Sequence, residues 1–119
     1  MIEQPILVVD DDPTILATVS EALDLEGFPV VTATNGAEAL DVVDRSVPSL
    51  VLLDMRMPVL DGWGFMHAIR ERDLSLKVVV MTAAADAQRW GREIGAQAVL
   101  AKHFELDELL LAIQRLLPA

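Results

Sequence analysis

The sequence predicts an α/β fold in which a parallel five-stranded sheet is covered by helices on both faces. Two observations predict this (βα)5 arrangement. Short apolar runs alternate with amphipathic segments from one end of the chain to the other. The runs are also almost continuously apolar, which is typical of strands that are covered on both faces rather than on one. Helical patterns between successive strands favour a parallel sheet.

The first strand is expected at Ile6–Val9, and the first helix follows it directly. Pro13 suits the first turn of a helix, and Gly27 suits a position just past its carboxyl end. Between them, apolar residues recur at helical spacing and share one face. These residues are Ile15, Leu16, Val19, Ala22 and Leu23.

The second strand is expected at Val30–Ala33 and the third at Leu50–Leu53. Between them, Asn35 followed by Glu38 resembles a capping box, in which each residue bonds to the backbone N–H of the other. A second helix is therefore predicted to begin directly after Asn35.

The last two strands are expected at Val78–Met81 and Ala98–Ala101. A final helix is indicated by another apolar stripe at helical spacing. Its residues are Leu106, Leu109, Leu110, Ile113 and Leu117.

The composition indicates one globular domain over residues 1–119, with 53% hydrophobic and 24% charged residues. The net charge of −10 argues against a nucleic-acid-binding face, which needs clustered Lys and Arg. The absence of Cys excludes disulfides and thiolate chemistry. The start "MIEQPIL" lacks the pattern of a signal peptide, and the longest apolar stretch, "VVVMTAAA", is too short to span a membrane. We therefore expect a soluble cytoplasmic protein that binds neither nucleic acid nor a membrane.

Polar side chains stand where four of the predicted strands end. Asp10–Asp12 follow the first strand, Asp54 the third, Thr82 the fourth and Lys102 the fifth. The carboxyl ends of parallel strands form the usual ligand-binding edge of such a sheet. Two carboxylates about 4 Å apart repel by about 4 kcal/mol at an effective dielectric constant near 20, so the cluster needs a compensating partner. A bound divalent cation is one candidate.

A purely structural interpretation explains only part of this pattern. Asp12 precedes Pro13 and is expected to cap the first helix. Asp54 has no helix beginning immediately after it, so capping does not account for it.

Four ordered motifs carry a resemblance to a known family. The segments "ILVVDDDPTI", "LVLLDMRMPVLDG", "VVVMTAAAD" and "AVLAKHF" are similar, in this order, to the motifs of response-regulator receiver domains. The resemblance covers almost the whole chain. It implies a doubly wound, flavodoxin-like sheet with the strand order 2-1-3-4-5.

The resemblance also implies a Mg²⁺ site. Asp11 and Asp54 are expected to bind the metal directly, Asp10 mostly through a bound water, and Arg56 through its backbone carbonyl. Mg²⁺ prefers this kind of ligand set, in which one or two carboxylates combine with water and phosphate oxygens.

By the same resemblance, Asp54 is the phosphoacceptor, and Thr82 and Lys102 contact the phosphoryl group. The expected partners are a sensor histidine kinase or a phosphotransfer protein, and an unknown downstream protein target. The implied activity is a switch with slow autodephosphorylation rather than a turnover enzyme. Arg56 and Ala84, each two residues after a site residue, are expected to give a long-lived phosphorylated form, with Arg56 shielding the phosphoryl group.

Three other functions remain open on the sequence. The segment "DDDPT" also fits the nucleophile motif of haloacid-dehalogenase-like phosphatases, with Asp10 as nucleophile and Asp12 as acid and base. That interpretation needs a further acidic pair at a strand end, whereas Asp107 and Glu108 lie in a helical pattern. A flavin-nucleotide binder would not place three carboxylates beside a phosphate. A receiver that acts only as an unphosphorylated interaction module is the third alternative.

The chain departs from the family pattern near its carboxyl end. Val99 stands where the family usually has an aromatic residue, and His103 stands where it usually has Pro. The stretch from Thr82 to Lys102 is also about one or two residues shorter than the usual family spacing, which implies a trimmed fourth helix. Because a cis bond before a non-proline residue costs about 2.5–4 kcal/mol, a trans bond is expected between Lys102 and His103. The output is then expected to run through the loop after the fourth strand, the short helix near Trp90 and the loop at His103.

Overall fold

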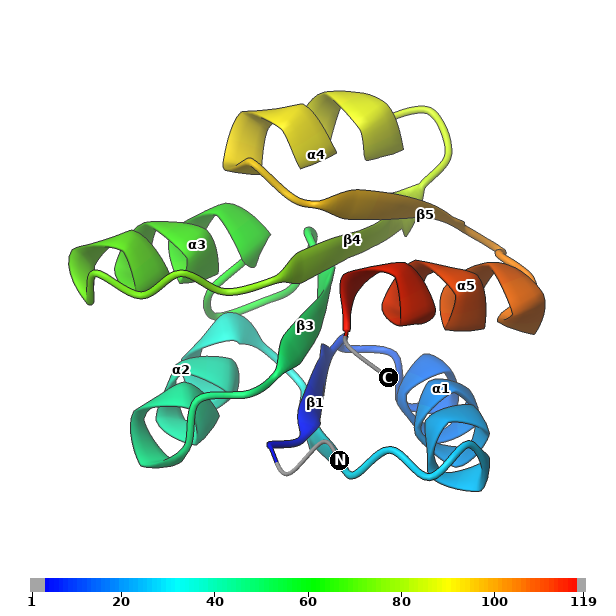
Figure 1. The fold of residues 1–119 in the computed structure, drawn as a ribbon. Helices are drawn as coiled ribbons and strands as arrows, with labels where there is room; N and C mark the ends of the chain where they lie inside the picture. Colours follow the sequence, from blue (N-terminus) through cyan, green and yellow to red (C-terminus); the bar gives the residue numbers. More distant parts are fainter. Residues whose placement is uncertain (1–3, 118–119) are drawn as a thin grey trace.

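The computed structural model describes residues 4–117, and its elements alternate strictly between strand and helix (Figure 1). Residues 1–3, at the start of the segment "MIEQPIL", lie outside the described part. The strands are β1 (Ile6–Val9), β2 (Val30–Ala33), β3 (Leu50–Asp54), β4 (Val78–Ala83) and β5 (Ala98–Lys102). The helices are α1 (Pro13–Leu25), α2 (Gly36–Arg45), α3 (Gly62–Glu71), α4 (Ala87–Ile94) and α5 (Leu106–Leu116).

All five strands are parallel and lie in the order β2-β1-β3-β4-β5. The predicted fold class and strand order are therefore confirmed. The last three strands run one or two residues beyond the apolar segments that predicted them and include Asp54, Thr82 and Lys102. Backbone pairing does not depend on side-chain polarity, so apolar patterning alone ends these strands too early.

Helices lie on both faces of the sheet (Figure 1), and each face has its own hydrophobic core. Helices α1 and α5 cover one face, and α2, α3 and α4 cover the other. Successive strand residues point to opposite faces, so Leu7 and Val9 enter one core while Ile6 and Val8 enter the other. Five helices on two faces bury the strands and leave the carboxyl edge of the sheet to position polar groups.

Two details of the helices differ from expectation. The Asn35 side chain accepts from the Glu38 N–H, as expected of an N-cap. The Glu38 carboxylate, however, accepts from the N–H and the hydroxyl of Thr34, at 2.7 Å each, and not from the N–H of Asn35. The expected capping box is therefore only half formed. Leu106 is 44% exposed, because it lies at the very start of α5, where the helix has not yet reached the core.

The peptide bond between Lys102 and His103 is cis, so the expectation of a trans bond was wrong. It rested on the preference of an isolated non-proline peptide, which takes no account of the tertiary contacts of Lys102.

Helix α4 has eight residues and is the shortest of the five, as expected. Among residues 4–117, no helix combines the length and the apolar character that crossing a membrane requires.

Candidate functional site

The fold brings four of the predicted site residues to one edge of the sheet. Asp10 directly follows β1, Asp54 ends β3, Thr82 lies near the end of β4, and Lys102 ends β5. The ammonium nitrogen of Lys102 lies 2.9 Å from Asp10 Oδ2 and 3.3 Å from Asp54 Oδ2. From the end of β5, the Lys102 ammonium thus reaches across β4 to two carboxylates at the ends of the neighbouring strands β1 and β3.

Asp10, Asp11 and Asp54 form an acidic cluster in which one carboxylate oxygen of each lies within 4.8 Å of the others. Asp10 and Asp54 are buried, whereas Asp11 is exposed. Carboxylate oxygens are hard ligands of the kind that Mg²⁺ binds, and the exposed side leaves room for the waters that this ion retains. The donor set therefore fits the expected metal.

The turn after β1 fixes how these carboxylates point. Asp10 Oδ1 accepts from the Asp12 N–H at 2.9 Å, and Asp12 Oδ1 accepts from the Thr14 N–H at 2.9 Å. Asp12 is thus the N-cap of α1, as predicted. The Asp12 carboxylate therefore bonds to the first turn of α1, whereas the Asp10 carboxylate faces Lys102.

The surroundings of Asp54 favour its protonated form. Burial raises the pKa of Asp54 most, and the neighbouring Asp10 carboxylate raises it further. The charge and hydrogen bond of Lys102 and a hydrogen bond from the Arg56 backbone lower it, and the resulting pKa is about 6. At pH 7.5 the Asp54 carboxylate is therefore mostly ionised, and Lys102 only partly offsets its negative charge.

Lys102 remains a cation in this setting. Burial alone would lower its pKa, but the hydrogen bond to Asp10 and the charges of Asp54 and Asp10 outweigh burial and raise it. A single ammonium faces two buried carboxylates, so the site holds excess negative charge that a bound cation would offset.

Thr82 is 3% exposed and pairs with Ala101 of β5. It lies one residue beyond Met81, which pairs with Asp54. The structure thus places Thr82 at the same edge of the sheet as Asp54.

The Arg56 side chain reaches helix α4 in the unphosphorylated protein. Its guanidinium carbon is 5.0 Å from the ring centroid of Trp90, so the side chain stacks on Trp90, and its expected shielding of a phosphoryl group stays a prediction. Trp90 also meets Trp63 edge to face, with centroids 4.9 Å apart. The sequence offered no signal for this contact, because residues 56 and 90 lie in separate elements with no shared motif.

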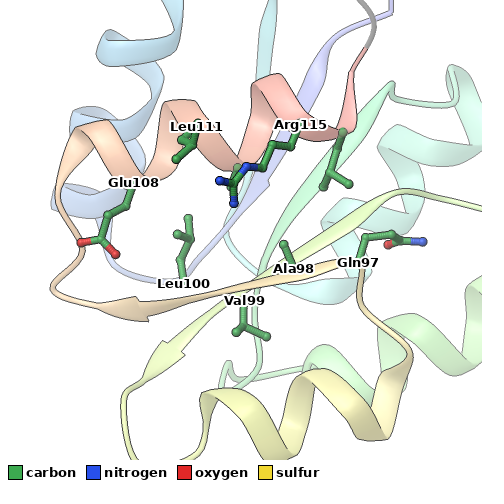
Figure 2. Close-up of a pocket in the computed structure, with 9 residues that line it drawn as sticks. Gln97, Ala98, Val99, Leu100, Glu108, Leu111 and Arg115 are labelled. Atoms are coloured by element: carbon green, nitrogen blue, oxygen red, sulfur yellow. The ribbon is translucent and has the colours of Figure 1, made fainter.

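Val99, in the place of the family's aromatic residue, packs tightly under α4. Figure 2 shows its side chain pointing from β5 toward α4, whereas Leu100 points toward α5. A Cβ added at Gly91 of α4 would collide with Cγ1 of Val99. Gly91 therefore lets the short helix approach β5 closely, and the small side chain at 99 fills the space below it.

Comparison with known proteins identifies the family of this chain. The family model "Response regulator receiver domain" matches residues 6–114. Sporulation initiation phosphotransferase F of Bacillus subtilis is 37% identical over 120 residues, which cover 99% of this chain and 97% of that protein. Transcriptional regulatory protein PrrA of Mycobacterium tuberculosis is 42% identical over 114 residues, which cover 94% of this chain but 49% of PrrA. The chain thus spans about half the length of PrrA.

Solved structures show the same fold. A putative response regulator from Chloroflexus aurantiacus matches with a TM-score of 0.87 at 31% identity, covering 95% of this chain and 96% of that one. Response regulator TrrA from Thermotoga maritima, in complex with Mg²⁺-BeF, matches with a TM-score of 0.84 at 33% identity, covering 96% and 99%. With its family model, its relatives and its fold in agreement, this chain belongs to the response regulator receiver domain family.

Proposed function

We propose that Asp54 accepts a phosphoryl group from a phosphohistidine in a Mg²⁺-dependent reaction, and that the phosphorylated form changes the protein's interactions. The observation that carries the proposal is the position of Asp54. It ends β3 inside a cluster with Asp10 and Asp11, and Lys102 contacts its carboxylate at 3.3 Å. The binding of Mg²⁺-BeF by TrrA is a property of that protein, and it supports the same chemistry here.

In the proposed step, a carboxylate oxygen of Asp54 attacks phosphorus and forms an O–P bond. The P–N bond of the phosphohistidine breaks, and its electron pair returns to the imidazole nitrogen, which takes up a proton. The product is an acyl phosphate on Asp54. A pKa of about 6 leaves Asp54 in the ionised, nucleophilic form at neutral pH, while its burial keeps that charge weakly solvated.

The chain's own groups would align this reaction and balance its charge. Asp11, Asp54 and the carbonyl of Arg56 would hold Mg²⁺ directly, and Asp10 would act mostly through a bound water. When bound, the ion supplies neutralisation of the charge on the transferring oxygens. Lys102 would donate to a phosphoryl oxygen from the position where it now meets Asp10 and Asp54, and the Thr82 hydroxyl would donate to another.

The surroundings of Asp10 argue against the phosphatase-like alternative. Both of its carboxylate oxygens are occupied, one by the Asp12 N–H and the other by Lys102. Asp12 caps α1 and is not free to act as acid and base. Asp107 and Glu108 lie in the first turn of α5 rather than at a strand end.

We infer that the phosphodonor is a sensor histidine kinase or a phosphotransfer protein, and that the phosphorylated form acts on a downstream protein as a switch rather than by turnover. The names of the relatives, a sporulation phosphotransferase and a transcriptional regulator, support signalling as the setting. We further propose that residues 1–119 form one receiver domain.

Intact-mass measurement after incubation with acetyl phosphate tests the proposal. We expect a gain of one phosphoryl group that requires Mg²⁺ and disappears in Asp54→Asn. Asp12→Asn is the matched control, because it removes the same charge but keeps a capping side chain, and it should be phosphorylated normally. A Mg²⁺-independent gain, or one that survives in Asp54→Asn, would overturn the assignment. No gain in the parent protein would favour the unphosphorylated interaction module.

A further inference from the structure

Arg56 connects the candidate site to helix α4 within one residue. Its backbone hydrogen-bonds to the Asp54 carboxylate, and its guanidinium lies over the ring of Trp90, 5.0 Å from the centroid. Arg56 also lines one surface hollow together with Asp11. The side chain therefore starts at the acidic cluster and ends on α4.

A second guanidinium, that of Arg89, also lies over the Trp90 ring, but it has a carboxylate partner. Arg89 lies 5.8 Å from the Trp90 centroid and forms an ion pair with Asp86 at 2.7 Å, at the start of the same helix. Over residues 4–117, no carboxylate forms an ion pair with the Arg56 side chain. Arg89 is thus held by the Asp86 carboxylate, whereas the Arg56 guanidinium is available to pair with an anion that forms nearby.

We propose that Arg56 is a switch residue that stacks on Trp90 while Asp54 is unmodified and binds the phosphoryl group once Asp54 is phosphorylated. The proposal rests on the proposed function of Asp54. A phosphoryl group carries a charge near −2 and three acceptor oxygens, and the planar guanidinium matches it with paired hydrogen bonds. A stacked guanidinium at an exposed site is a weaker interaction, so Arg56 leaves Trp90 and loosens the contact that holds α4.

This route does not need a ring on β5. Val99 packs directly under Gly91 and has no aromatic side chain to rotate. Trp90 is itself only 5% exposed, and the Arg56 guanidinium covers part of its ring. The departure of Arg56 therefore changes the surroundings of Trp90 and of α4 without any movement of Val99.

The indole N–H signals of Trp63 and Trp90 in NMR spectra test the exchange, with Trp63→Phe to assign them. In the parent protein, phosphorylation by acetyl phosphate and Mg²⁺ should shift the Trp90 signal. Before any phosphorylation, Arg56→Gln should already move that signal in the same direction. Phosphorylation of Arg56→Gln should then add a shift several-fold smaller than in the parent. Arg89→Gln is the matched control: it also loses a guanidinium over the ring but should keep the full phosphorylation shift.

Intact mass on each sample separates the two proposals. A parent protein that gains no phosphoryl group refutes the function of Asp54. A phosphorylated parent whose Trp90 signal does not move refutes the exchange alone. An Arg56→Gln protein whose unphosphorylated Trp90 signal matches the parent, or moves in the opposite direction to the phosphorylation shift, also refutes it, and this comparison needs no phosphorylation of the variant.

Discussion

Lys102 Nζ lies 2.9 Å from Oδ2 of Asp10, a carboxylate with no exposed surface. The same nitrogen is 3.3 Å from Asp54. Structural stability and the proposed chemistry therefore share one ammonium group, and its removal should affect both.

Lys102→Ala should lower the free energy of unfolding of the metal-free protein by about 3 kcal/mol, because it leaves a buried carboxylate unpaired. Urea unfolding measures this loss. Lys77→Ala is the control, since Lys77 is exposed and its ammonium donates to the Leu116 carbonyl. Lys102→Ala should also show little phosphorylation-dependent change in its amide spectrum. Equal stabilities of the two variants would contradict the role of Lys102.

Asp11→Asn should stabilise the metal-free protein while it weakens Mg²⁺ binding. It removes one of three clustered charges at an exposed position, for which we expect a gain of about 0.5–1 kcal/mol. Thermal melts with and without Mg²⁺ measure both effects, and Asp12→Asn controls for net charge. A variant that is less stable without metal, yet phosphorylates normally, would refute the proposed trade-off.

The raised pKa of Asp54 predicts a pH dependence of stability. Between pH 3.8, where the unfolded carboxyl titrates, and about 6, the folded protein binds more protons at Asp54 than the unfolded one. The stability that this group contributes is therefore complete below about pH 4 and is lost as the pH rises through 6. Without metal, the free energy of unfolding of Asp54→Asn should exceed that of the parent by about 1–2 kcal/mol at pH 7.5. Near pH 4 the two free energies should be equal.

Asp44→Asn is the control for this titration, because the pKa of Asp44 is shifted in the opposite direction to that of Asp54. Asp44 pairs with Arg72, which lowers the pKa of Asp44. Its contribution is present at neutral pH and lost as the pH falls. If the advantage of Asp54→Asn did not change between pH 4 and 7.5, the raised pKa would be contradicted.

Arg56→Ala and Ala84→Glu should each shorten the lifetime of the phosphorylated form. The first removes the side chain that is proposed to cover the phosphoryl group, and the second adds a carboxylate that can orient an attacking water. Ala85→Glu is the control, since it places the same charge one residue further along the exposed loop. The decay of the phosphorylated mass after donor removal gives the half-lives. Half-lives of both variants equal to that of the parent would count against this account.

Most of the fold could be predicted from the sequence because the apolar runs are so regular. Strands β1 and β2 match their predicted bounds, and the edge position of Asp54 follows from the end of β3. The capping role of Asp12 was also predictable, because it depends on neighbouring residues alone. The strand order came from the family resemblance, not from the periodicity.

Contacts between distant residues could not be predicted in this way. The stacking of Arg56 on Trp90 and the packing of Val99 under Gly91 depend on how closely α4 approaches the sheet. The cis bond after Lys102 was likewise not predicted, because the local preference of a non-proline peptide favours the trans form.

The central claim is that Asp54 carries the phosphoryl group, and borohydride trapping tests it most directly. Reduction of an aspartyl phosphate converts that residue to homoserine, which peptide mass mapping locates. The account predicts homoserine at position 54 alone, and only in samples treated with acetyl phosphate and Mg²⁺. Homoserine at position 10 would contradict the account and establish the phosphatase-like chemistry in its place.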